Sequence, residues 1–266
     1  MKREVALVTG ASTGIGRACA EQLAAAGFAV YGTARRPGRS SGGVNMIPLD
    51  VRDDNSVMAC VKRVLREAGQ IDVLVNNAGV AMEGAIEETS LEEIRGVMET
   101  NFFGVVRMIR EVLPSMRQQQ RGRIINMGSM AGFLPMPYSA AYCASKHALR
   151  GLTESLDHEV RNFGIRACLI EPGFIQTEIA QRSPVAATQF EPYISARSRP
   201  SRAFRREVEN GVDPHVVAET VVKAATTDFP RPRYLPDGTA TMGAILRSAI
   251  PAPIFDFLFR KQMGLD

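Results

Sequence analysis

The segment that decides the fold is Val5-Ala6-Leu7-Val8-Thr9-Gly10-Ala11-Ser12-Thr13-Gly14-Ile15-Gly16, close to the amino terminus. Its first four residues form an apolar run without polar alternation, which is typical of a strand buried on both faces of a parallel sheet. The pattern from Arg17 to Ala26 then predicts a helix that ends before Gly27. A glycine turn lets the backbone approach a pyrophosphate closely, and the amino terminus of the helix offers unpaired N–H groups to it. The segment therefore predicts a dinucleotide-binding strand, turn and helix.

The alternation of strands and helices continues along the chain. Further strands are expected at 29–33, 45–49, 72–75, 123–127, 164–170 and near 233–235. Apolar spacing predicts a helix that carries Val57, Val61, Val64 and Leu65, a long core-facing helix from Leu91 to Leu113 that Pro114 stops, and a helix that begins at Asp213-Pro214. The 266 residues suit one large unit. We expect a single doubly wound Rossmann-type α/β domain over 1–266, with a seven-stranded, mostly parallel sheet and helices on both faces.

Composition excludes few classes of protein. The formal net charge is +4, and the cations are spread along the sequence, so a solvated surface is favoured over a nucleic-acid-binding face. The four cysteines lie far apart, which predicts neither a zinc site nor a disulfide framework and fits a reducing compartment. No signal-peptide pattern and no apolar run of membrane-spanning length is present in the sequence, so we expect a cytoplasmic protein without an integral membrane segment.

The end of the second expected strand bears on the choice of cofactor. An acidic residue in this place suits the ribose 2′-hydroxyl of NAD, whereas an arginine suits the 2′-phosphate of NADP. Here the sequence reads Ala34-Arg35-Arg36, so no carboxylate repels a phosphate and Arg35 could bind one. NADP(H) is therefore expected over NAD(H), and the alternative is that both arginines are simply solvated.

Polar residues at the carboxyl ends of later strands are candidates for the site. The fourth strand is followed by Asn76-Asn77-Ala78-Gly79 and the fifth by Gly128-Ser129, where open α/β sheets bind ligands. For Asn77, stabilisation of the turn could be the whole role. Asn101 interrupts the apolar pattern of the long helix. Tyr142 and Lys146 are four residues apart, so on a helix a phenol and a cation that lowers its pKa would share one face.

Together these residues resemble the short-chain dehydrogenase/reductase family, with matches from residue 5 to about 177. The matches are Thr9 to Gly16, Asp50, Asn76 to Gly79, Asn101, Ser129, Tyr142 with Lys146, and Pro172-Gly173. Ala34 to Pro37 and Glu171 to Phe174 resemble the hydroxysteroid and retinol dehydrogenases more closely, although this match is weaker.

The resemblance implies roles for these residues. Tyr142 would be the general acid in reduction and the base in oxidation, Ser129 would polarise the carbonyl oxygen, Lys146 would hold the nicotinamide ribose and lower the pKa of the phenol, and Asn101 would support Lys146. The cofactor-binding residues are expected to be Gly10, Ser12, Thr13, Gly14, Ile15, Gly16, Arg35, Arg36, Asp50, Val51, Asn76, Asn77, Ala78, Gly79, Tyr142, Lys146, Pro172, Gly173 and Thr177. The family also implies a homodimer or homotetramer.

The region after the sixth strand is expected to vary with the substrate. By resemblance, a substrate lid is expected at about 177–212, where aromatic residues stand beside many arginines. Those arginines could meet an anionic tail of the substrate or could form a solvated helix face. The apolar tail at about 240–266 is expected to pack over the pocket or against a second subunit rather than on a membrane, although its aromatic residues keep membrane contact open.

The expected function is an NADP(H)-dependent oxidoreductase acting on an apolar ketone or secondary alcohol. Phe133, Leu134, Met136 and Phe174 are the reason for expecting an apolar substrate, and they do not distinguish a steroid from a retinoid, acyl or xenobiotic one. The alternatives are a 3-oxoacyl thioester reductase, a non-catalytic NADP(H)-sensing protein, and a sugar-nucleotide epimerase or dehydratase.

Overall fold

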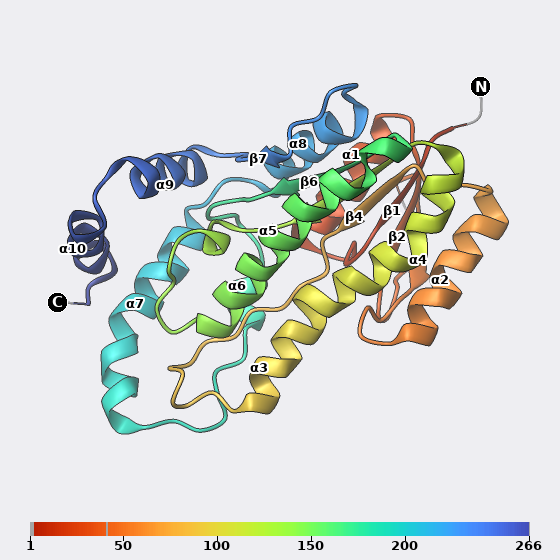
Figure 1. The fold of residues 1–266 in the computed structure, drawn as a ribbon. Coiled ribbons are helices and arrows are strands. Elements are labelled where there is room, and N and C mark those ends of the chain that lie inside the picture. Colours follow the sequence, from red (N-terminus) through yellow and green to blue (C-terminus); the bar gives the residue numbers. More distant parts are fainter. Residues whose placement is uncertain (1–2, 41, 266) are drawn as a thin grey trace.

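Seven parallel strands form the centre of the protein (Figure 1). The computed structural model describes residues 3–40 and 42–265. The strand order is β3-β2-β1-β4-β5-β6-β7, and every pairing is parallel. The strands are β1 (Val5–Val8), β2 (Ala29–Ala34), β3 (Val44–Pro48), β4 (Val73–Asn76), β5 (Gly122–Met127), β6 (Ile165–Ile170) and β7 (Arg233–Tyr234). This confirms the expected fold class, a doubly wound Rossmann-type sheet.

Helices cover both faces of the sheet (Figure 1). On one face lie α1 and α8, whose apolar side chains pack against every second residue of the central strands and form one core cluster with them. On the other face lie α2, α4 and α5, which pack with the second cluster. The bounds are α1 (Gly14–Ala25), α2 (Asp54–Ala68), α4 (Gly104–Gln119), α5 (Ala140–Val160) and α8 (Pro214–Thr226).

Both cores are built from aliphatic side chains that alternate along the strands. In β1, Ala6 and Val8 face α1 and α8, whereas Val5 and Leu7 face the opposite layer. All four residues of β1 are buried, as the run without polar alternation predicts. Loss of apolar surface from water on both faces is the main stabilising contribution to such a layered sheet.

The long helix expected from Leu91 to Leu113 is interrupted and extended. It consists of α3 (Leu91–Met98), a π-helical turn at Glu99–Phe103, and α4, which continues past Pro114 to Gln119. The prediction that Pro114 stops the helix is therefore wrong. Pro114 lies on the exposed side of α4, where water can bind the carbonyl left without a donor, and Met116 in the next turn is fully buried.

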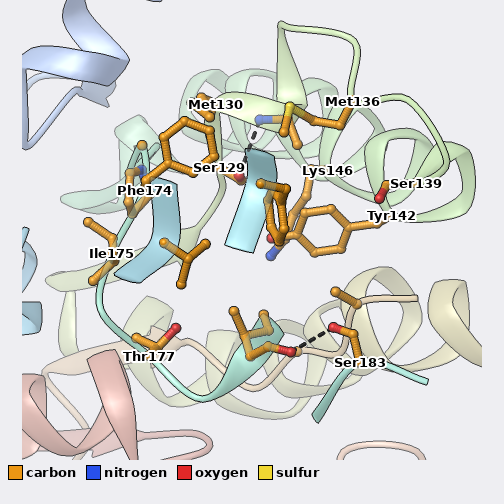
Figure 2. Close-up of a pocket in the computed structure, with 18 of the residues that line it drawn as sticks. Ser129, Met130, Met136, Ser139, Tyr142, Lys146, Phe174, Ile175, Thr177 and Ser183 are labelled. Atoms are coloured by element: carbon orange, nitrogen blue, oxygen red, sulfur yellow. Dashed lines mark hydrogen bonds between the residues drawn. The ribbon is translucent and has the colours of Figure 1, made fainter. Parts of the chain in front are cut away.

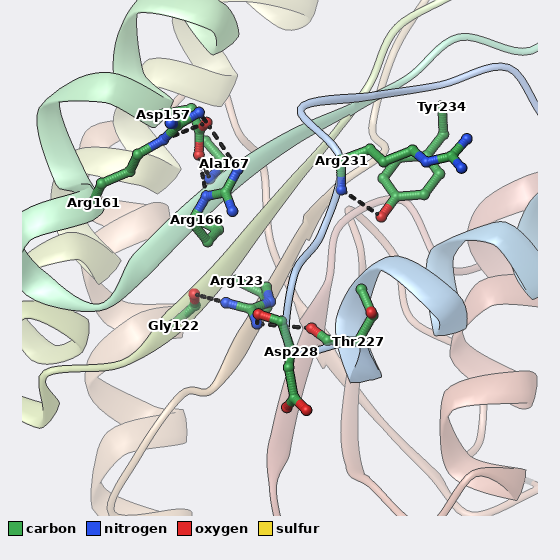
Figure 3. Close-up of polar contacts among 10 residues, drawn as sticks. All are labelled: Gly122, Arg123, Asp157, Arg161, Arg166, Ala167, Thr227, Asp228, Arg231 and Tyr234. Carbon is green, nitrogen blue, oxygen red and sulfur yellow. Dashed lines mark hydrogen bonds and ion pairs between the residues drawn. The ribbon is translucent and has the colours of Figure 1, made fainter.

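Helix α5 is joined to β6 by a buried carboxylate (Figure 3). Asp157 is 1% exposed and pairs with Arg161 at 2.5 Å and with Arg166 at 2.8 Å. It also accepts a hydrogen bond from the N–H group of Ala167 at 3.0 Å. These contacts hold the pKa of Asp157 at about 2, because together they outweigh the burial that would raise it. The helix that carries Tyr142 is therefore fixed to the sheet at its far end.

The remaining helices lie beyond the carboxyl ends of the strands. The expected lid region contains α6 (Ile179–Arg182) and α7 (Glu191–Glu209), although apolar periodicity there is weak. The expected tail contains α9 (Gly238–Ala249) and α10 (Ala252–Met263), which lie with α7 at one end of the molecule (Figure 1). Within the described ranges, no helix is both long and apolar enough to cross a membrane.

Candidate active site

The glycine turn between β1 and α1 lies close to the end of β4. Gly10 and Gly14 have φ values of +66° and +53°, a region that favours glycine. A Cβ atom on Gly16 would stand 2.2 Å from the carbonyl oxygen of Gly10 and 2.3 Å from Nδ2 of Asn77. No side chain fits there. These three glycines thus leave a turn whose backbone is accessible to a phosphate, and the site fits a dinucleotide.

Asn77 and Thr9 tie the two central strands together at this turn. Nδ2 of Asn77 donates to the carbonyl oxygens of Thr9 and Gly10, at 3.0 and 3.1 Å. Oγ1 of Thr9 accepts from the N–H groups of Asn77 and Ala78, at 2.9 and 3.0 Å. The side chain of Asn77 is thus used to shape the turn. β1 and β4 are neighbours whose connections run in opposite directions, which is where such sheets form a ligand crevice.

Ser129, Tyr142 and Lys146 converge beside this crevice (Figure 2). Ser129 follows β5, and the other two residues lie one turn apart on α5. The Ser129 hydroxyl lies on the same side of the pocket as the phenol of Tyr142, and Nζ of Lys146 lies 5.7 Å from the centroid of the Tyr142 ring. Nζ also donates to the carbonyl oxygen of Met127 at 2.8 Å. A proton donor and a cation are therefore held beside one cavity.

Burial shifts the two titrating groups in opposite directions. It raises the pKa of Tyr142 to about 12, although the nearby Ser129 hydroxyl lowers this pKa slightly. It lowers the pKa of Lys146 to about 8, because the ammonium ion loses its water. In the protein alone the pKa of the phenol is therefore raised overall, because desolvation dominates. Tyr142 is protonated at neutral pH, which is the form that a general acid requires.

Asn101 lies in the π-helical turn and contacts the same group of residues. It is 1% exposed, and its Oδ1 and Nδ2 atoms bond the N–H and carbonyl groups of Val80, at 2.8 and 2.9 Å. Nδ2 also donates to Oγ of Ser145 at 3.0 Å. A Cβ atom on Gly79 would lie 3.3 Å from Oδ1 of Asn101 and 3.9 Å from Nζ of Lys146. Asn101 thus stands next to Lys146 and is joined to α5 through Ser145.

A largely apolar pocket, continuous with solvent, adjoins Ser129, Tyr142 and Lys146, with an empty volume of about 1310 Å³. The rings of Phe174 and of Phe204 on α7 meet edge to face, with centroids 5.9 Å apart. Phe133 and Leu134, expected here, pack in the adjoining apolar cluster. The apolar lining includes Met82, Met130, Met136, Phe174, Phe204 and Met263.

Several expected cofactor residues line this pocket or its edge. Ile15, Asn77, Gly79, Pro172, Gly173 and Thr177 all do. Ser12 and Thr13 are exposed in the glycine turn, and Arg35 and Arg36 are exposed just beyond β2. Across 3–40 and 42–265, no ion pair is formed by either of these two arginines.

Three other expected residues have packing or turn contacts. Asn76 is 2% exposed, and its Nδ2 donates to Oδ1 of Asn126 at 2.8 Å, so its side chain holds β4 to β5. Val51 is buried against Gly104 on α4. Asp50 accepts from the N–H group of Arg52 at 3.0 Å and so shapes the turn after β3.

Two residues that support the site were not expected from the sequence. Asp237 accepts from the N–H group of Gly173 at 2.7 Å and from that of Ala240 at 2.9 Å, so it joins the cofactor-side loop to α9. An aspartate before a helical segment was the only available signal. Glu88, which is 2% exposed, pairs with Arg197 on α7 at 2.5 Å and fixes the lid region.

The fold and the site together define a Rossmann-type oxidoreductase. The family model described as short chain dehydrogenase matches residues 4–186. The chain is 38% identical to 3-ketodihydrosphingosine reductase of Bacteroides thetaiotaomicron over 86% of each protein. It is 34% identical to human 17-beta-hydroxysteroid dehydrogenase type 1, over 88% of this chain and 77% of that protein.

Solved structures agree. A short-chain dehydrogenase from Streptomyces avermitilis superposes with a TM-score of 0.83, at 33% identity over 98% of each chain. A short-chain dehydrogenase/reductase from Burkholderia phymatum, solved in complex with NAD, gives 0.78 at 29% identity, over 93% of this chain and 92% of that one. The chain belongs to the short-chain dehydrogenase/reductase family of nicotinamide-dependent oxidoreductases, and hydroxysteroid dehydrogenases are among its relatives.

Proposed function

We propose that the protein is an NADPH-dependent reductase of apolar ketones, with Tyr142 as the general acid. One observation carries the proposal: the protonated phenol of Tyr142 and the hydroxyl of Ser129 border the same apolar pocket beside the glycine turn. Two relatives, named for a ketodihydrosphingosine and for a hydroxysteroid, support an apolar substrate with a carbonyl or hydroxyl group. The reverse reaction would oxidise the corresponding secondary alcohol.

Different residues of the chain would bind the cofactor, bind the substrate and transfer the proton during reduction. The turn of Gly10, Gly14 and Gly16 would hold the pyrophosphate, and a bound nicotinamide cofactor would supply the hydride. Ser129 would donate a hydrogen bond to the substrate carbonyl oxygen, and Tyr142 would transfer its proton to that oxygen. Lys146 would hold the ribose and would favour the phenolate that remains, because a cation beside a phenolate stabilises it.

The first prediction concerns Tyr142. Tyr142→Phe removes the proton donor and keeps the ring, so we expect kcat to fall by about a hundred- to ten-thousandfold while cofactor affinity changes little. The measurement is NADPH oxidation, followed by absorbance, with steroid ketones, retinal, long-chain ketones and aryl ketones. Tyr138→Phe is the matched control, since Tyr138 also lines the pocket. Undiminished turnover in Tyr142→Phe would overturn the assigned role.

The second prediction concerns the cofactor. Arg35 is exposed at the end of β2, where no carboxylate would repel a 2′-phosphate, and this supports NADPH although one solved relative holds NAD. We expect Arg35→Ser to lower kcat/KM for NADPH by about tenfold or more and to leave that for NADH nearly unchanged. Arg66→Ser, at an exposed arginine on α2, is the control. Equal loss with both cofactors, or a preference of the unmodified protein for NADH, would contradict the assignment.

A 3-oxoacyl thioester is the second candidate substrate, and Arg205 favours it. Arg205 lines the apolar pocket and also an adjacent hollow that includes Arg202 and Ser198. An anionic tail could lie along these residues, although Arg205 already stands 3.9 Å from Glu83. If the KM for such a thioester is unchanged in the variant with Arg202→Gln and Arg205→Gln, this candidate is excluded. NADPH binding without turnover on any carbonyl would favour a cofactor sensor instead.

A further inference from the structure

Helix α9 presents its large apolar residues to solvent and its small residues to the protein. Met242, Ile245 and Leu246 are 56%, 53% and 39% exposed, and their spacing places them on one side of the helix. On the opposite side, Ala240 is fully buried, and a Cβ atom on Gly243 would stand 2.8 Å from Leu134. This arrangement is the reverse of that in an ordinary core-facing helix.

Helix α10 repeats the pattern with larger side chains. Ile254, Phe257 and Leu258 are 54%, 62% and 48% exposed and again lie on one side of the helix. On the inner side, the ring of Phe255 is buried and lies 5.1 Å from the guanidinium carbon of Arg247 on α9. The two helices therefore contact each other through their inner residues, and both outer rows stay open. Single exposed apolar residues are common, but two helical rows of them indicate an interaction surface.

The inner side of α10, opposite its exposed row, adjoins the substrate pocket. Met263 at the end of α10 lines the pocket. Phe255 and Phe259 pack with Phe133, Met136 and Phe174, of which the last two line the pocket. An occupant of the outer rows would thus be separated from the pocket by helix α10.

The charges beside the rows favour an anionic occupant. After Asp237 the charged residues are Arg247, Arg260 and Lys261 against Asp256 and Asp266, the last of which lies outside the described residues. Arg199 of α7 adds a further cation, because its side chain lies against Gly264 at the end of α10. In a symmetric contact between two copies the same cations would approach each other, whereas anionic lipid headgroups would be complementary to them.

We propose that the outer rows of α9 and α10 dock the protein on an anionic lipid bilayer, with α10 between the bilayer and the substrate pocket. Apolar side chains at the outer rows would enter the acyl boundary while Lys261, exposed on the outer side of α10, stays among the headgroups, as in interfacial amphipathic helices. The use of such docking for substrate uptake rests on the proposed function. The docking itself does not.

The experiment is co-sedimentation with vesicles, which needs no turnover. The full chain is mixed with vesicles of phosphatidylcholine alone or of equal parts phosphatidylcholine and phosphatidylserine. We expect binding to the anionic vesicles that weakens in high salt, and at least about a tenfold loss of affinity in the variant with Ile245→Ser and Phe257→Ser. The matched control carries Ile86→Ser and Phe229→Ser, which are 64% and 88% exposed elsewhere on the surface. It should bind as the unmodified protein does.

Two further measurements decide between occupants and separate the two proposals. Light scattering after gel filtration gives the mass in solution. A lower mass of the Ile245→Ser, Phe257→Ser variant, without vesicle binding by the unmodified protein, would assign the rows to a second copy and overturn the proposal. Equal vesicle binding by both variants would also overturn it. Turnover of a water-soluble aryl ketone should be unchanged in the Ile245→Ser, Phe257→Ser variant. If neither the unmodified protein nor the variants turn this ketone over, that result counts against the proposed function and not against membrane docking.

Discussion

Desolvation rather than charge proximity sets the protonation of Tyr142 and Lys146 in the protein alone. The phenol has a pKa of about 12 and the amine one of about 8, so at neutral pH the phenol holds its proton and the amine is mostly charged. The helical spacing of four residues correctly places both groups on one side of α5. The spacing does not reveal how far the phenol and the amine are removed from water, because their burial depends on β5 and on the pocket walls.

The turn that begins with Ser129 is held by a second buried pair. Glu171, fully buried after β6, is bonded by Arg233, whose guanidinium also lies 4.7 Å from the ring of Phe133. A Cβ atom on Gly132 would lie 3.5 Å from Oε1 of Glu171. Burial raises the pKa of Glu171 despite the cation beside it. The pair of Glu171 and Arg233 therefore packs against the short helical turn at Met130–Gly132.

The third prediction tests this pair by a double-mutant cycle. Arg233→Met leaves the Glu171 carboxylate buried without its cation, so we expect a loss of about 3–5 kcal/mol in the free energy of unfolding. Glu171→Leu combined with Arg233→Met removes both charges and should recover most of that loss. Urea unfolding, followed by circular dichroism, measures the unmodified protein, the two single variants Arg233→Met and Glu171→Leu, and the double variant. If the double variant is as unstable as Arg233→Met, the two residues are not coupled.

At the level of elements, helix α7 of the expected lid is fastened by acidic residues of the segment before α3. Glu88 accepts hydrogen bonds from the N–H groups of Ala85 and Phe190 at 3.0 and 2.8 Å, in addition to its pair with Arg197. Burial raises the pKa of Glu88, but these N–H groups and the Arg197 charge outweigh it and hold the pKa below its ordinary value. Ser201 donates to Glu83 at 2.5 Å nearby. Arg197 is thus occupied inside the protein and is not available to an anionic substrate.

The fourth prediction is that loss of this fastening frees α7. Arg197→Gln leaves Glu88 buried and unpaired, so local opening of the lid should become more frequent and tryptic cleavage within 191–209 faster by at least about tenfold. Arg202→Gln is the matched control, because Arg202 is exposed on the same helix and precedes Ala203, so this variant also loses one tryptic site. Mass spectrometry of timed digests locates the cuts. Equal rates in the two variants would show that the pair does not fasten the lid.

For the whole molecule, Asp157 makes stability depend on pH in the acidic range. Its pKa is about 2 in the folded protein against an ordinary value of 3.8, so the folded state favours the ionised carboxylate. The resulting stabilisation is complete above about pH 4 and is lost as pH falls through 2, because both states are then protonated. Its size is about 2 kcal/mol at neutral pH.

The fifth prediction follows from that sign. Asp157→Asn should reduce the free energy of unfolding by about 2 kcal/mol or more between pH 5 and 8, and the difference from the unmodified protein should shrink as pH falls below about 4. Urea titrations over that range measure it. Asp54→Asn is the control, because Asp54 is also paired with an arginine but its side chain is 83% exposed. A difference that is the same at every pH would refute the role of ionisation.

The sequence by itself determined the sheet and the position of the site in it. The apolar run from Val5 to Val8 and the glycine spacing from Gly10 to Gly16 are local patterns. In an α/β chain, the first predicts a buried parallel strand and the second predicts a tight turn before a helix. The carboxyl ends of parallel strands meet at one edge, so the chain order already brought Asn77, Ser129 and Tyr142 together.

Only the tertiary structure decided which polar residues are used for support and which remain free. Asn76 turned out to bond Asn126, Arg197 to pair with Glu88, and α4 to continue through Pro114. It also showed that α9 and α10 each leave a row of large apolar side chains in water. Each of these outcomes depends on contacts between residues far apart in the chain. It also depends on how far those contacts remove polar groups from water, which a local sequence pattern does not show.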